Sequence, residues 1–220
     1  HNPAGVALSS RRATALARLL DGTDVVVVED DHSGDLASGP LVSIGAHRPA
    51  HTVHIRSFSK SHGPDLRLAA VGGAGDVVSA VTNRRLLGPG WSSRILQAVL
   101  LALLDDPATD DSVRAARAEY QRRRRIVSDV LTSRGVEVRG RDGINLWVRV
   151  VDERSALITL AAQGVGAAPG EPFLVLPDDD HLRLTLSPLH GTDAEIAAIG
   201  GRLADAALGA TAGGGQVSRA

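Results

Sequence analysis

Residues 24–28 form an almost unbroken run of valine, and three acidic residues follow it directly. A run of this kind is typical of a strand that is buried on both faces of a parallel sheet. Residues 11–20 precede it and carry apolar side chains at helical spacing. Residues 52–56 have apolar side chains at alternate positions, which predicts a second strand. Helices and strands in this order indicate an α/β fold with a mainly parallel sheet and flanking helices.

The rest of the chain predicts a division into a larger and a smaller part. Residues 1–108 are expected to form the α/β part, and one long connecting helix is expected over residues 109–134. Residues 135–208 alternate short strands and helices, which predicts a small α+β domain. Residues 209–220 are small and glycine-rich, and we expect them to be disordered.

Composition excludes several classes of function. The chain has 220 residues, enough for one large domain or two small ones. Its net charge of −1 gives no general electrostatic reason to bind nucleic acid or membranes. The absence of cysteine excludes disulfides and thiolate metal sites. No apolar segment is long enough to span a bilayer and none resembles a signal peptide, so we expect a cytoplasmic protein.

Lys60 is the only lysine in the chain, and arginine supplies all the other strongly basic side chains. Lysine can lose its proton and attack a carbonyl carbon as a neutral amine, whereas arginine stays charged. A single lysine in an arginine-rich chain therefore indicates Schiff-base chemistry with an aldehyde cofactor or a carbonyl substrate. The alternative is a surface lysine without a function, and this segment alone gives the two interpretations similar weight.

Lys60 follows the predicted strand at residues 52–56, and ligands bind at the carboxyl ends of strands in open α/β sheets. The hydroxyls of Ser57 and Ser59 and the guanidinium of Arg67 lie near it in the sequence. Together they can bind an anion, and phosphate is the obvious candidate. A structural ion pair is the competing interpretation of Arg67.

These segments resemble the fold-type I enzymes that use pyridoxal 5'-phosphate (PLP), the aspartate aminotransferase superfamily. They are more narrowly similar to the aminotransferase-like domain of MocR-type regulators in the GntR superfamily. The matching segments occur in the family's order: His-Asn-Pro-Ala-Gly at residues 1–5, Val-Glu-Asp-Asp at 28–31, Ser-Phe-Ser-Lys at 57–60, Arg67, and Leu-Arg-Leu at 182–184. The resemblance covers residues 1–208 and implies part of a fold-type I PLP-transferase large domain followed by its small domain.

The resemblance implies a role for each residue around Lys60. Lys60 would form the Schiff base with PLP and act as the proton shuttle. Ser57 and Arg67 would bind the phosphate, and Ser59 is counted among the cofactor-binding residues. Arginine suits a phosphate because its planar fork matches two oxygens at once.

Three more residues match positions that contact the cofactor ring. Asp30 matches the aspartate that pairs with the pyridine nitrogen. Opposite charges about 3 Å apart attract by roughly 5 kcal/mol at an effective dielectric near 20, or about 4 pK units, which keeps a pyridine protonated. Asn2 and His32 match the partners of the ring oxygen, although the family usually has tyrosine where this chain has His32. Without the resemblance, the acids are better interpreted as a solvated loop.

Arg183 lies in residues 182–186, which alternate leucine with polar side chains and predict a half-buried strand. The resemblance implies that Arg183 binds the α-carboxylate of an amino acid. On general grounds the favoured alternative is an outward-facing, solvated arginine.

Two other patterns invite a binding interpretation, and both are rejected. Residues 122–125 are four consecutive arginines, but on a helix they fan around the axis and form no single basic stripe. We interpret them as a solvated helix face. Histidines gather between residues 47 and 62, but His51 and His54 face opposite sides of a strand, and no cysteine or paired carboxylate completes a metal site.

The leading functional hypothesis is the PLP-binding, effector-sensing domain of a MocR/GntR-type transcription regulator, which responds to an amino acid or other small amine. The alternative is an active class I/II aminotransferase that transfers an amino group from an amino acid to a 2-oxo acid. A third possibility is a degenerate fold that serves only for dimerisation. We expect a homodimer that contacts no membrane and reaches DNA only through an N-terminal domain absent from this chain.

The chain begins at His1, inside a motif and without methionine, and we interpret it as a fragment. The resemblance implies that the first half of the large domain, with a glycine-rich phosphate loop, precedes it. We therefore expect residues 1–220 alone to bind PLP weakly.

Overall fold

The computed structural model describes residues 1–176 and 179–209, and the chain packs into two compact units. One unit is Ala7–Arg117, and the other combines His1–Val6 with the chain from Ala118 onward. This division differs from the expected large domain at residues 1–108, because the first six residues pack with the later unit. From residue 210 onward, the tail that we expect to be disordered lies outside the described residues.

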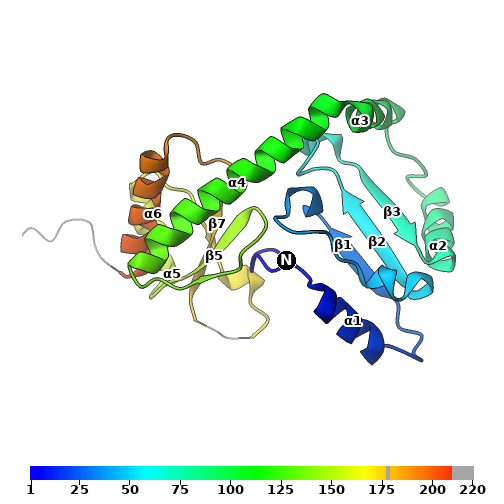
Figure 1. Cartoon of the computed structure of the whole chain (residues 1–220), viewed down its shortest axis with the longest axis horizontal. Helices are drawn as coiled ribbons and strands as arrows, with labels where there is room; N and C mark the ends of the chain where they lie inside the picture. Colours follow the sequence, from blue (N-terminus) through cyan, green and yellow to red (C-terminus); the bar gives the residue numbers. More distant parts are fainter. Residues whose placement is uncertain (177–178, 210–220) are drawn as a thin grey trace, which may run out of the picture. The chain divides into compact units, whose positions relative to one another are not determined.

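The sheet of the unit Ala7–Arg117 has three strands in the order β1-β2-β3 (Figure 1). These are β1 (Val27–Asp31), β2 (Thr52–Ser57) and β3 (Ala69–Gly73). β1 pairs with β2 in parallel, and β2 pairs with β3 antiparallel. The helices of this unit are α1 (Ser10–Leu19), α2 (Gly75–Leu86) and α3 (Arg94–Asp105), with 3-10 turns at Gly34–Leu36, Ile44–Ala46, Pro49–His51 and Pro64–Leu66.

β1 begins three residues later than predicted and includes the acids. The sequence predicts a strand at residues 24–28, whereas β1 covers Val27–Asp31 and pairs along most of β2. The carbonyls of Thr23 and Val25 accept hydrogen bonds from the Arg48 guanidinium instead, at 3.0 and 3.3 Å. A run of identical valines does not indicate which residue begins the strand, so the first residue of β1 is set by its pairing with β2.

Two small apolar clusters stabilise this unit. One consists of Ala13, Ala17 and Ile44, and the other of Phe58, Leu66 and Leu100. Within α3, only Leu100 is buried. Ile95 and Leu101 are 77% and 60% exposed, so α3 leaves apolar side chains uncovered.

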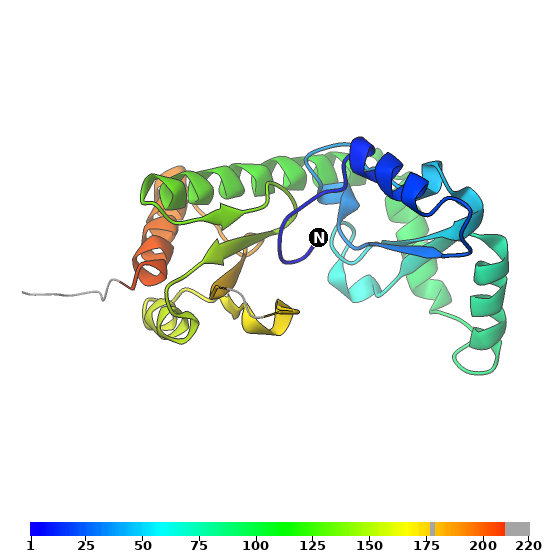
Figure 2. The ribbon, with the colours of Figure 1, turned by 90° about the horizontal axis from the view of Figure 1, so that it is seen from below.

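The other unit contains a four-stranded antiparallel sheet with the order β4-β5-β7-β6 (Figures 1 and 2). Its strands are β4 (Val138–Arg139), β5 (Asn145–Arg149), β6 (Ala168–Pro169) and β7 (His181–Thr185). Its helices are α4 (Pro107–Ser133), which begins in the first unit, α5 (Glu153–Ala162) and α6 (Asp193–Ala207), with a 3-10 turn at Glu171–Phe173. The predicted small α+β unit is therefore present.

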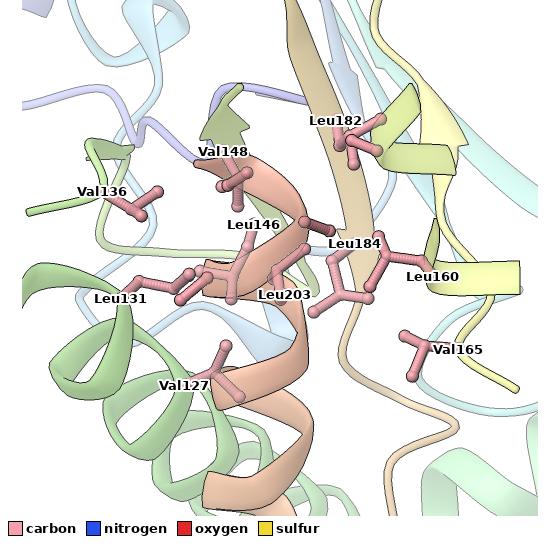
Figure 3. Close-up of a cluster of buried hydrophobic side chains, with 14 of the residues drawn as sticks. Val127, Leu131, Val136, Leu146, Val148, Leu160, Val165, Leu182, Leu184 and Leu203 are labelled. Atoms are coloured by element: carbon pink, nitrogen blue, oxygen red, sulfur yellow. The ribbon is translucent and has the colours of Figure 1, made fainter. Parts of the chain in front are cut away.

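One face of this sheet packs against α4, α5 and α6 and forms the main core (Figure 3). Leu146 and Leu184 on neighbouring strands meet Leu131, Leu160 and Leu203 from the three helices, and all five are at most 1% exposed. Truncating one such leucine to alanine costs about 2–5 kcal/mol. Because side chains alternate along a strand, the opposite face of the sheet carries another set. That set is Asn145, Trp147, Arg183 and Thr185.

The four consecutive arginines of α4 are not the solvated face that we predicted. Arg123 and Arg124 are only 8% and 7% exposed. Arg123 donates to the carbonyl of Ser187 at 2.8 Å and to Glu119 at 2.7 Å, and Arg124 donates to the carbonyl of Gly143 at 2.8 Å. Consecutive helix residues point in different directions, so two of the four face the unit and bind backbone oxygens there.

Candidate functional site

The carboxyl ends of β1 and β2 lie at the same edge of the sheet because the two strands run parallel (Figure 1). β1 ends at Asp31 and β2 ends at Ser57, and the register aligns these ends within one residue. The predicted residues Asp30 and His32 therefore lie at the edge from which the lysine segment, residues 57–60, leaves the sheet. In open α/β sheets this edge is where ligands bind.

Glu29, the first of the three acids, has a structural role. One carboxylate oxygen accepts a hydrogen bond from Ser43 Oγ at 2.5 Å, and the other accepts from the N–H of Ile44 at 2.7 Å. The carboxylate also lies 3.3 Å from His54 Nδ1 on β2. Glu29 thus attaches the turn Ile44–Ala46 to the sheet, and its oxygens are already occupied.

Asp31 is occupied in a similar way, whereas Asp30 is not. Asp31 accepts a hydrogen bond from the N–H of Gly34 at 2.6 Å and lies 3.5 Å from His54 Nε2. Side chains alternate along a strand, so Asp30 points to the other face, where it is exposed. Within the residues that the structure describes, the Asp30 carboxylate has no hydrogen bond or ion pair. Of the three acids, Asp30 is the one available to a ligand.

Phe58 anchors the lysine segment to the unit. Its ring is 5% exposed, and its N–H donates to the carbonyl of Leu68 at 3.1 Å. Its carbonyl accepts from the N–H of His62 at 2.9 Å, and the Arg56 guanidinium carbon lies 5.1 Å from its ring centroid. Lys60 lies between these anchored residues with an exposed side chain that has no partner in the described part of the chain. The backbone is held while the amine stays accessible.

Asp35, which was not among the predicted site residues, also holds this segment. Its carboxylate accepts hydrogen bonds from Arg56 at 2.8 Å and from Ser61 Oγ at 2.9 Å. Its backbone carbonyl accepts two more from the Arg117 guanidinium, at 3.0 and 2.6 Å. These partners lie 21 to 82 residues away, so no local pattern could have revealed them.

Arg67 has a strained backbone. Its φ of 49° is in the left-handed region, and no other non-glycine residue in the described ranges has a positive φ. That conformation costs about 1–2 kcal/mol for a residue with a side chain. Arg67 stands two residues before β3, whose Ala69 pairs with Ser57. Its exposed guanidinium has no partner among the described residues. Strain of this kind is a reason to suspect function.

Ser57 and Ser59 supply the hydroxyls beside Lys60. The Ser57 Oγ accepts a hydrogen bond from the N–H of Ser59 at 3.3 Å. Neither hydroxyl donates to another described residue, so each can donate to an anion. An amine, two hydroxyls and a guanidinium are a donor set that suits an aldehyde carrying a phosphate.

Asn2 lies in the other unit, on a turn that packs against the hairpin between β4 and β5. The carbonyl of Gly5 accepts from the N–H groups of Arg141 and Asp142, at 2.9 and 3.0 Å. The Asn2 Oδ1 accepts from Asn145 Nδ2 at 2.9 Å. These bonds explain why residues 1–6 pack with the later part of the chain.

Arg183, in the middle of β7, is half-buried. It is therefore not the fully solvated arginine that was the favoured alternative in the sequence analysis. Its guanidinium carbon lies 4.9 Å from the ring centroid of Phe173, and it pairs across the sheet with Trp147. Its Nε is buried without a hydrogen-bond partner in the described part of the chain. A planar cation held against an aromatic ring is suited to bind a carboxylate.

Residues 1–176 and 179–209 lack the features of two other kinds of site. No group of three or more His, Asp or Glu side chains there is placed to hold a metal ion. In the same ranges, no helix is both long enough and apolar enough to cross a membrane.

The relatives of this chain include regulators and aminotransferases. The model of the family "Aminotransferase class I and II" matches residues 1–202. The vitamin B6 salvage pathway transcriptional repressor PtsJ of Salmonella typhimurium is 36% identical over 198 residues, which are 89% of this chain and 46% of that protein. The HTH-type transcriptional regulator TauR of Rhodobacter capsulatus is 28% identical over 184 residues, 79% of this chain and 38% of that protein. The chain thus spans less than half the length of both.

The fold matches solved aminotransferases. A tetra mutant of Thermus thermophilus aspartate aminotransferase superimposes with a TM-score of 0.81 at 24% identity, covering 94% of this chain and 57% of that one. The family match and this superposition confirm the predicted fold-type I architecture, which is generally PLP-dependent. The chain therefore belongs to the class I and II aminotransferase family.

Proposed function

We propose that this chain is the PLP-binding, effector-sensing part of a MocR-type transcription regulator of the GntR superfamily. The observation that carries the proposal is the free amine of Lys60 at the carboxyl edge of the β1–β2 pair, where Asp30 is also unpaired. The similarity to two transcriptional regulators, one of them named for vitamin B6 salvage, supports regulation rather than metabolism.

The donor set around Lys60 fits PLP. Lys60 would hold the cofactor covalently, because its neutral amine can form a C=N bond to an aldehyde with the loss of one water. Ser57, Ser59 and Arg67 donate to the phosphate, and none of their donor groups is used by another described side chain. When bound, PLP supplies the electron sink for chemistry at an amino acid's Cα.

Four further residues complete the proposed contacts. Asp30 holds the pyridine nitrogen protonated, and Asn2 and His32 donate to the ring oxygen. Arg183 binds the carboxylate of the effector, supported by its placement against Phe173. The ligand class is therefore a small amine with a carboxylate, such as an amino acid.

An active aminotransferase is the second candidate. The aspartate/prephenate aminotransferase of Thermus thermophilus is 28% identical over 193 residues, 84% of this chain and 49% of that enzyme. His32 argues against efficient turnover, because the family usually has tyrosine at this position. In the regulator, amine exchange at Lys60 shifts the domain between conformations rather than releasing a product.

Assembly and location follow from the same proposal. The uncovered apolar side chains of α3, such as Ile95 and Leu101, support a homodimer. DNA is contacted by an N-terminal domain outside this chain, and the protein works in the cytoplasm.

The test is the absorbance spectrum of the full-length protein with PLP. We expect a visible band that is lost in Lys60→Ala and also in Lys60→Arg, which keeps the charge but cannot form the bond. No band in the parent protein would refute PLP binding. With a band present, sustained 2-oxo acid production from amino acids would favour the enzyme. A spectral change without turnover, together with altered operator binding, would favour the regulator.

A further inference from the structure

Asn145, the first residue of β5, is a polar side chain in an unusual place. It is 8% exposed, although the other buried residues of β5 are apolar or aromatic. Its register partner on β7 is Thr185. Both residues lie on the sheet face opposite to the main core, together with Arg183. One weak signal in the sequence marks Asn145, because it is a polar residue at the start of an apolar strand.

The Asn145 side chain uses both ends of its amide. Its Nδ2 donates to Asn2 Oδ1 at 2.9 Å, and its Oδ1 accepts from Thr185 Oγ1 at 3.0 Å. A buried polar group left unpaired costs about 1–3 kcal/mol. Because both ends are satisfied, the amide has one preferred orientation.

This orientation determines what Asn2 can offer. With its Oδ1 occupied by Asn145, the Asn2 side chain has its Nδ2 left as a donor. A donor is the group that an electron-rich ring oxygen requires, whereas a flipped Asn2 would present a second oxygen and repel it.

The backbone on both sides of this contact is held in place. The turn that carries Asn2 is fixed through Gly5 and lies so close to Gly140 that an added Cβ there would come 2.0 Å from the Ala4 carbonyl oxygen. On the other side, the Arg124 guanidinium donates to the carbonyls of Gly143 and Asn145, at 2.8 and 2.5 Å. Little backbone freedom remains, so the side-chain contact sets the orientation.

Burial lowers the pKa of Arg124, which marks the cost of placing a cation there. Its Nη2 donates both of the hydrogen bonds that hold the backbone around Asn145.

We infer that Asn145 is a positioning residue that orients the Asn2 amide toward the cofactor's ring oxygen. This inference rests on the proposed role of Asn2 in binding PLP. Asn145 also connects Asn2 to Thr185, which stands two residues from Arg183 on the same face of β7. The Asn145 side chain thus links Asn2 to the strand that carries Arg183.

The test measures the pH at which the visible band of the PLP-loaded, full-length protein changes form. A donor to the ring oxygen stabilises the unprotonated form of the Lys60 linkage, so losing it raises the pKa of that linkage. We expect Asn145→Leu to raise this pKa by about one unit, and we expect the same shift from Asn2→Ala. Asn83→Leu is the matched control, because Asn83 is an exposed asparagine of α2.

A double-mutant cycle separates positioning from a general loss of structure. If Asn145 acts through Asn2, adding Asn145→Leu to Asn2→Ala moves the pKa no further. Additive shifts, or an unshifted pKa in Asn145→Leu beside a lowered melting temperature, would overturn the inference. A parent protein without any band would refute the proposed function, whereas a band whose pKa is unshifted in Asn145→Leu would refute only this role of Asn145.

A second readout does not depend on the cofactor. The chain contains only three asparagines, so asparagine-selective ¹⁵N labelling of residues 1–220 gives three side-chain amide signals. We expect Asn145→Leu to shift the Asn2 amide signals and Asn83→Leu to leave them in place. Unmoved Asn2 signals in Asn145→Leu would overturn the inference.

Discussion

Replacing Glu119 by glutamine tests the ion pairs within α4 that orient Arg122 and Arg123. The Glu119 carboxylate accepts two hydrogen bonds from Arg122 and one from Arg123, each at 2.7 Å. The two bonds from Arg122, and then the one from Arg123, lower the pKa of Glu119 from 4.5 to about 2. Arg122 also pairs with Asp193 at the start of α6. Glu119 therefore orients two arginines, one of which is buried.

The pH dependence follows from the direction of this pKa shift. A carboxyl whose pKa is lowered on folding contributes stability above its unfolded pKa, and that stability is lost as the pH falls through the folded pKa. The loss therefore occurs from pH 4.5 down to about 2. The full shift corresponds to about 3 kcal/mol. Because the side chain is 33% exposed, solvent screening reduces the contribution to about 1–2 kcal/mol.

Urea unfolding followed by tryptophan fluorescence measures this contribution. Trp147 is 6% exposed and lies in the same unit as Glu119, whereas Trp91 is 86% exposed and changes little on unfolding. We expect Glu119→Gln to lose about 1–2 kcal/mol at pH 7 and close to nothing at pH 2. Asp129→Asn is the control, because Asp129 is exposed on α4 and has no partner among the described residues. Equal losses for Glu119→Gln at both pH values would refute the electrostatic account.

Two predictions concern the proposed site. Asp30→Asn should abolish or shift the PLP band without changing the melting temperature. Asp31→Asn should lower the melting temperature, because Asp31 contacts Gly34 and His54. The opposite pattern would make Asp31 the ligand contact and Asp30 the structural residue. Arg67→Gly relieves about 1–2 kcal/mol of backbone strain and gives back about 0.5–1 kcal/mol in unfolded-chain entropy. Arg67→Gly should therefore keep or slightly raise stability while weakening PLP binding roughly tenfold or more. Arg67→Lys keeps the strained backbone and should raise neither the stability nor the affinity for PLP. Thermal melts measure the stability, and titration with PLP measures the affinity.

The helix bounds were largely predictable because local capping residues mark them. Ser9, Ser93 and Asp152 each accept an N–H from the first turn of a helix. Thr192 and Glu195 form a full capping box at the start of α6. Each of these signals lies within three residues of the helix that it begins, so the sequence alone carries it.

The burial of Arg123 and Arg124 could not be predicted in this way. Their acceptors include the carbonyls of Ser187 and Asn145, which lie 64 and 21 residues away. A backbone carbonyl has no sequence signature, so a buried arginine that binds one looks the same in the sequence as a solvated arginine. Asn145 escaped notice for the same reason, since its partner Asn2 lies 143 residues away.

The proposed site depends most on which residues belong to β1 and on which face of the sheet each of their side chains lies. With a strand at residues 24–28, the acids would follow it as a loop, and no face could be assigned to any of them. In β1 as it folds, alternation sends Glu29 and Asp31 to one face, where hydrogen bonds occupy both, and sends Asp30 to the other. The resemblance selects Asp30 by its place in a motif, and the hydrogen bonds select the same carboxylate by elimination. A register shift of one residue would exchange the faces, so the pairing of β1 with β2 also determines which acid can meet a ligand.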